Sequence, residues 1–204
     1  MYLYPLWVRL WHFINAVLIL ILIITGFSIW FAGSDTESLT SGYAKAARWH
    51  NISAIILIIS YMGFVIGNVM SGNGKHYRIK KNDISPGIGR QLKYYLYGKY
   101  KNKKQPFPVT SENKFNPLKK VTYLLIMYLA LPLLIITGII LLIPDIVFTE
   151  NPGPGMYILI DILHIVLGLM ISLFLIIHIY LCTIGTKSLS LIRGIITGYY
   201  TSDE

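Results

Sequence analysis

Four of the five histidines in the chain lie in or beside long uncharged stretches, at His12, His50, His164 and His178. An ionisable side chain is costly in an apolar membrane helix, so such a residue usually serves a function. A lone histidine is often hydrogen-bonded within its own helix, but four of them need a shared explanation. Neutral imidazole is a common metal ligand and also a proton carrier, so the two chemistries to weigh are metal coordination and proton relay.

The spacing in the last stretch favours metal coordination. His164 and His178 are 14 residues apart, and 14 helical steps of 100° return to within about 40° of the same face. At 1.5 Å per residue, the two positions are about 21 Å apart along the helix axis. One helix face therefore carries a histidine towards each side of a membrane, which suits two metal centres stacked across it.

The elements that carry these histidines are predicted to be membrane spans. Of 204 residues, 54% are hydrophobic and 13% charged, whereas a soluble domain has about a quarter charged residues. Four uncharged stretches reach the ~20 residues needed to cross the bilayer. The fold class is thus an all-α membrane protein, a four-helix bundle forming a single domain, 1–204, without strand patterns or tandem repeats. The expected spans are about 6–32, 45–70, 118–143 and 156–185. The first is too long for a cleavable signal peptide.

The charge distribution predicts the orientation of the bundle. The net charge is +9, and 13 of the 18 Lys and Arg residues lie between Ser71 and Lys120, whereas the other two links hold only Lys45. Such an excess marks the cytoplasmic side. The loop at about 71–117, both termini and a C-terminal surface helix at about 188–200 are therefore expected to be cytoplasmic, in a bacterial inner membrane. The basic loop is expected to meet lipid headgroups and not nucleic acid.

This orientation fixes the depth of each histidine. His12 begins a span that runs outward and His178 ends one that runs inward, so both are expected near the cytoplasm. His50 and His164 are expected near the periplasm by the same argument. The depths pair His12 with His178 and His50 with His164, because the opposite pairing would have to bridge about 20 Å.

Each pair can supply two imidazoles to one haem iron from opposite sides. An iron with two protein ligands has no open position, so it transfers electrons instead of activating oxygen. The single cysteine, Cys182, excludes a C-x-x-C-H motif, so the expected cofactors are two non-covalently bound haem b groups. The remaining histidine, His76, has no partner at a matching depth.

Two further kinds of residue fit this interpretation. Each of Gly26 and Gly63 is expected at the depth of the haem that its own span does not ligate. A glycine there would leave space for the macrocycle, or would simply let two helices pack closely. Arg9 and Arg48 lie near the membrane boundaries beside the proposed haems. They could pair with haem propionates or simply extend to the interface.

The sequence resembles the bacterial cytochrome b561 group, which includes the cytochrome b subunits of nickel–iron hydrogenases, formate dehydrogenase N and thiosulfate reductase. The similarity rests on "PLWVRLWHFINAVLILILIITGFSIWFA" (5–32), "ARWHNISA" (47–54) and "LHIVLGLMISLFLIIHIYLCTIG" (163–185). The last segment, followed by "LIRGIITGYY" (191–200), is most similar to the thiosulfate reductase type. In this group the first two spans give one haem histidine each and the fourth gives two, which matches the four positions above.

The resemblance implies a role as an electron-transfer subunit of a respiratory oxidoreductase complex, not a complete enzyme. Such subunits connect the membrane quinone pool, menaquinone or ubiquinone, with a periplasmic partner that is an iron–sulfur protein or a c-type cytochrome. The resemblance also implies a quinone site near the cytoplasmic-side haem, where depth suggests Asn15, His178, Tyr123 and the start of the basic loop as neighbours. No ligand set for an iron–sulfur cluster occurs in the chain, so such centres would belong to the partner.

A transporter and a membrane anchor are the other functions that four such spans could serve. A small proton or solute transporter with a histidine relay predicts more polar residues along the spans, yet Asp161 near the outer boundary is the only acid expected within them. A purely structural membrane anchor does not explain four histidines at two matched depths. Both alternatives therefore account for less of the sequence than the dihaem cytochrome.

Overall fold

The computed structural model describes residues 2–32, 42–77, 79, 83–98, 100–101, 103–108, 114–148, 152–183 and 190–199. Within these ranges, four helical spans are long and apolar enough to cross a membrane. They are α1 (Leu6–Phe31), α2 (Tyr43–Met70), a composite span from Pro117 to Leu142, and α7 (Pro154–Thr183). The composite span consists of α4 (Pro117–Leu125), a π-helical turn (Ile126–Ala130) and α5 (Leu131–Leu142). The prediction of an all-helical, four-span membrane protein is confirmed.

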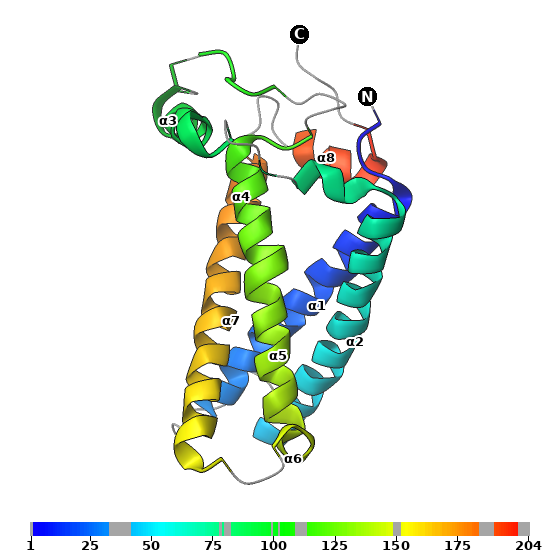
Figure 1. Cartoon of the computed structure of the whole chain (residues 1–204), viewed down its shortest axis with the longest axis vertical. Coiled ribbons are helices and arrows are strands. Elements are labelled where there is room, and N and C mark those ends of the chain that lie inside the picture. The colour runs from blue at the N-terminus through cyan, green and yellow to red at the C-terminus, as the bar shows by residue number, and fades with distance from the viewer. Residues whose placement is uncertain are drawn as a thin grey trace.

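The four spans form two closely packed pairs (Figure 1). Helix α1 packs along α2, and α5 packs along α7, while α2 also contacts α5. The short helices α3 (Ile88–Lys93) and α8 (Ser190–Thr197) lie at the same end as the first residues of the chain, which we call the basic end. Helix α6 (Pro144–Val147) lies at the opposite end, the far end (Figure 1).

A hydrophobic core joins the two pairs at mid-depth. Its buried members come from all four spans: Leu18, Leu57, Tyr61, Phe64, Leu131 and Ile171. Ile171 lies seven residues from each histidine of α7, so the core is halfway between them. Large apolar side chains such as Phe13, Ile59 and Ile176 are instead 71%, 68% and 66% exposed. A lipid environment accepts such a surface, whereas water would not.

The π-helical turn in the composite span is explained by Pro132. The Leu131 N–H bonds the carbonyl of Ile126, five residues earlier. In the same register, residue 132 would bond the carbonyl of Met127, but proline has no N–H. The Tyr61 hydroxyl of α2 donates to that Met127 carbonyl at 2.9 Å. A side chain from the other helix pair thus satisfies the backbone group that Pro132 leaves free.

At the basic end, α8 is fastened to the start of α1. The Leu3 N–H donates to the Gly198 carbonyl at 2.9 Å. The Arg9 guanidinium donates to the carbonyls of Ile195 and Ile196 in the last turn of α8, where a cation complements the helix dipole. Gly198 has φ +87°, and a Cβ there would lie 2.8 Å from the Tyr2 ring, so this turn requires glycine.

The link before the third span is also ordered by buried polar contacts. Helical turns run from Pro86 to Gly98 around α3, after a kink at Ser85, whose backbone is extended. The Lys120 ammonium contacts the Asp83 carboxylate at 3.1 Å, with side chains 7% and 12% exposed. The Asn116 side chain accepts from the Lys119 N–H and so caps α4, while its amide donates to the Tyr95 hydroxyl at 3.0 Å. Burial raises the pKa of that Tyr95 hydroxyl.

Candidate functional site

The four span histidines meet in two pairs, both of which include α7. The ring centres of His12 on α1 and His178 on α7 are 6.2 Å apart, with an interplanar angle of 50°. Those of His50 on α2 and His164 on α7 are 6.3 Å apart, with an angle of 69°. The first pair lies towards the basic end and the second towards the far end. These are the same pairs that the depth argument predicts.

The separation of the rings fits a shared metal. An imidazole nitrogen lies about 2 Å from a bound first-row metal and its ring centre roughly 1 Å further, so two imidazoles on opposite sides have centres about 6 Å apart. Both pairs match this spacing to within a few tenths of an ångström. Direct hydrogen bonding would bring the rings closer. Each pair is therefore spaced to hold one iron between two nitrogens.

The far-end pair is held by two threonine hydroxyls. Thr25 Oγ1 lies 3.0 Å from His50 Nδ1, and Thr137 Oγ1 lies 2.9 Å from His164 Nδ1. Each hydroxyl has one proton, which it donates to a backbone carbonyl of its own helix: Ile21 at 2.7 Å for Thr25, and Leu133 at 3.0 Å for Thr137. The oxygens therefore accept from Nδ1–H. This tautomer leaves Nε2 of each imidazole with a free lone pair for a metal.

A pentapeptide that occurs in two spans supplies both threonines, neither of which was predicted from the sequence. "LIITG" occurs at residues 22–26 of α1 and again at 134–138 of α5. In each copy the glycine after the threonine faces the same imidazole. A Cβ at Gly26 would lie 3.5 Å from His50 Cε1, and one at Gly138 would lie 3.2 Å from His164 Cε1. An identical segment in two spans was a signal available in the sequence, but a search for tandem repeats does not find it.

The basic-end pair has different surroundings. Among the described residues, the His12 imidazole has no hydrogen-bond partner, and the His178 imidazole has only the Cys182 thiol, 3.9 Å from its Nε2. The Phe174 ring lies 5.6 Å from the His178 ring. Lys119, at the start of α4, is close enough to interact electrostatically with His178 and Cys182. This pair therefore lies in a more apolar setting with a cation at its edge.

Comparison with known proteins identifies the family. The sequence matches the family described as prokaryotic cytochrome b561 over residues 3–198. The chain belongs to that family. It is 35% identical over 199 residues to the Escherichia coli (strain K12) protein named "Putative cytochrome YdhU", covering 98% of this chain and 74% of the relative. No solved structure matches it. The resemblance read from the sequence is thus confirmed, and the chain is a haem-binding, multi-pass membrane cytochrome.

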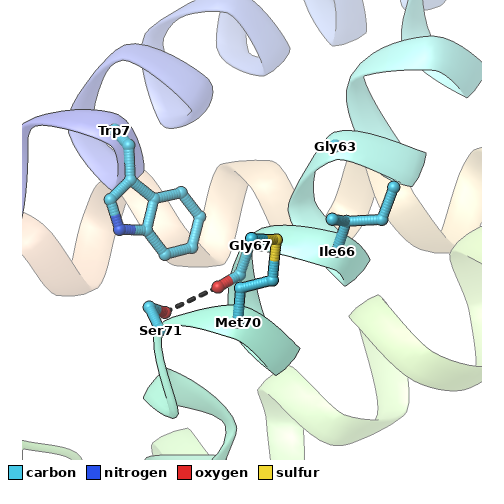
Figure 2. Close-up of a pocket in the computed structure, with 6 residues that line it drawn as sticks. All are labelled: Trp7, Gly63, Ile66, Gly67, Met70 and Ser71. Atoms are coloured by element: carbon cyan, nitrogen blue, oxygen red, sulfur yellow. Dashed lines mark hydrogen bonds between the residues drawn. The ribbon is translucent and has the colours of Figure 1, made fainter.

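The other residues predicted for this cytochrome b561 site lie in several places. Gly26 faces His50, as described above. Arg9 contacts the last turn of α8, and Arg48 is exposed two residues before His50. Gly63 has no non-local atom within 4 Å of a Cβ position. It lies in an open, apolar groove of about 480 Å³ beside Trp7, whose ring covers Gly67 (Figure 2). The haem-contacting roles of both arginines and of Gly63 stay predictions.

The residues proposed near a quinone are likewise at the basic end. The Asn15 amide donates to the Trp11 carbonyl at 2.8 Å and to Ser60 Oγ at 2.7 Å, which turns it towards α2. The Tyr123 ring packs edge-on against Phe115, with centres 5.2 Å apart. Lys119 was not anticipated from the sequence. It could have been suspected, because it is a lysine one turn before Tyr123 at the start of a membrane span.

Proposed function

We propose that this cytochrome is a dihaem b-type membrane subunit that transfers electrons between the quinone pool and a periplasmic redox partner. The observation that carries the proposal is that each histidine of α7 meets a histidine from α1 or α2. The ring centres are 6.2 Å apart in one pair and 6.3 Å apart in the other. The positions of the two α7 histidines, 14 residues apart on one helix, correspond to an axial separation of about 21 Å. Two haem b groups, one per histidine pair, would supply one-electron chemistry at the two depths.

The protein residues have separate tasks in this proposal. The four histidines would hold the two irons, one pair at each, and would leave no open position for oxygen. The mid-depth core around Phe64 and Ile171 keeps water out of the space between the two centres. The far-end pair would exchange electrons with a periplasmic partner, an iron–sulfur protein or a c-type cytochrome. That partner would carry its own redox centre, because this sequence has no ligand set for an iron–sulfur cluster and no motif for c-type haem. The basic end is then cytoplasmic, in a bacterial inner membrane.

The quinone is proposed to react at the basic end, next to the His12–His178 pair. Reduction of a quinone takes up two protons with two electrons, and oxidation of a quinol releases them, so the site needs groups that bind the quinone oxygens. Lys119 and Tyr123 offer an ammonium and a phenol on the same face of α4, and Lys119 interacts with His178. The ammonium of Lys119 beside His178, with the phenol of Tyr123 one turn later, supports this assignment of the two ends.

Purified protein tests the proposal directly. We expect a reduced-minus-oxidised b-type spectrum and two haems per chain by the pyridine haemochrome assay. His12→Ala or His178→Ala should each remove one haem, His50→Ala or His164→Ala the other, and a quinol should reduce the wild-type haems. His76→Gln, outside both pairs, is the matched control and should retain two. Colourless folded protein, or His178→Ala that keeps both haems, would refute the assignment.

A further inference from the structure

The far-end histidines are each held by the neighbouring helix of their own pair. His50 on α2 bonds Thr25 on α1, and His164 on α7 bonds Thr137 on α5. The two threonines are 3% and 4% exposed. The carbonyls of Leu22 and Leu134, the first residues of the two pentapeptides, are also within hydrogen-bonding reach of the same imidazoles. The far-end site is thus supported twice by the same short segment.

This support has an electronic effect on a metal ligand. An imidazole that donates Nδ1–H to an oxygen gains electron density at Nε2 and becomes a more basic ligand. A more basic axial ligand stabilises the oxidised iron more than the reduced iron, and second-shell hydrogen bonds are among the means by which proteins set a haem potential. Two such bonds act on the far-end site. The basic-end site has no hydroxyl acceptor on either histidine among the described residues.

We propose that Thr25 and Thr137 are positioning residues that hold His50 and His164 as Nδ1–H tautomers and lower the reduction potential of the far-end haem below that of the basic-end haem. This inference rests on the dihaem function proposed above. It also gives a reason why the two haems would differ in reduction potential, because the two "LIITG" segments support the far-end histidines only. An electron shared between the two centres would then reside mainly at the basic end.

Threonine-to-valine exchange tests the proposal, since valine keeps the shape and removes the hydroxyl. Redox titration of the purified, haem-loaded protein should show an upward shift of the far-end potential in Thr25→Val and in Thr137→Val, and a larger shift in the double variant. Each bond is stronger with oxidised than with reduced iron, and only this difference shifts the potential, so its loss should raise the reduced-to-oxidised ratio at fixed ambient potential by up to about fivefold, the whole worth of one net hydrogen bond. The basic-end potential should stay unchanged. The far-end haem should also change its low-temperature electron paramagnetic resonance signal.

Two comparisons keep the test decisive. Thr122 donates to the Leu118 carbonyl at 2.8 Å in the same way but forms no hydrogen bond with a histidine among the described residues, so Thr122→Val should leave both potentials unchanged. Thr25→Ser and Thr137→Ser retain a hydroxyl and should restore the wild-type potential. If valine variants lose the far-end haem and serine variants keep it, the holding role is supported.

Other results would overturn the inference. Unchanged far-end potential and signal in the double valine variant, equal shifts of both haems, or loss of the far-end haem in the serine variants would each contradict it. A wild-type protein without haem would instead contradict the dihaem function itself, so the two failures are distinguishable.

Discussion

The Asp83–Lys120 pair shows how single residues order the basic end. Both side chains are almost completely buried, and the carboxylate lies 3.1 Å from the ammonium. Gln91 of α3, in the same link, is also fully buried. A buried charge is tolerable only with its partner present, so the pair ties the link to α4.

Removal of one partner should therefore be costly. Asp83→Asn leaves a buried ammonium unpaired, and we expect the free energy of unfolding to fall by about 3–5 kcal/mol. Asp83→Leu combined with Lys120→Met should recover most of that loss, because no charge then remains buried. Thermal unfolding in detergent, followed by circular dichroism, measures both effects. Asp145→Asn at the exposed far end is the control, and equal effects of Asp83→Asn and Asp145→Asn would contradict the prediction.

At this scale the sequence predicted the histidines but not their supports. Periodicity and topology place His164 and His178 on one face, because helix geometry converts sequence spacing into angle and depth. For Thr25 and Thr137, periodicity and topology give no such signal, and only the repeated "LIITG" segment marks them. A threonine in a membrane helix normally bonds its own backbone, as both do here, and its second role depends on which helix is adjacent.

At the scale of elements, the interrupted third span stands out. The π-helical turn before Pro132 leaves the Met127 carbonyl to be satisfied by Tyr61 of α2, 66 positions away in the chain. Proline at this position predicted a disturbed helix. Its compensation was not predictable, because it depends on a tyrosine whose position relative to this turn is set only by the packing of α2 against α5.

The interaction between Tyr61 and Pro132 can be measured by a double-mutant cycle. Tyr61→Phe should cost about 1 kcal/mol of unfolding free energy, since it leaves a buried carbonyl without a donor. Pro132→Ala supplies an N–H at the same place, so Tyr61→Phe should cost clearly less in that background. Denaturant unfolding in mixed micelles provides the four values. Additive losses would show that the hydroxyl does not compensate for the proline.

At the scale of the whole molecule, the ends of the bundle differ in charge. The link at the basic end carries most of the cations. One of them, the Lys114 ammonium, donates to the Leu3 carbonyl at 2.8 Å. Burial lowers the pKa of this ammonium. The number of spans followed from length and hydropathy alone. Their pairing did not, because spans that are apolar all round give no periodic signal for a buried face.

Cysteine labelling tests the predicted orientation. In a Cys182→Ala background, Asp145→Cys marks the far end and Lys103→Cys the basic end, both at exposed positions. A membrane-impermeant maleimide applied to intact spheroplasts should label Asp145→Cys, and should label Lys103→Cys only after lysis. This outcome follows from the retention of the basic loop in the cytoplasm. The reverse pattern would place the quinone and the redox partner on opposite sides to those proposed.

The arrangement of α7 also bears on how such a protein is assembled. Its backbone packs along α5, whereas it reaches α1 and α2 through the two imidazole pairs and, halfway between them, through Ile171 in the core. An iron bound at each pair would act as a cross-link between an early and a late helical hairpin, one near each membrane surface. Insertion of the prosthetic groups would then complete tertiary folding, and haem supply would limit how much mature protein accumulates.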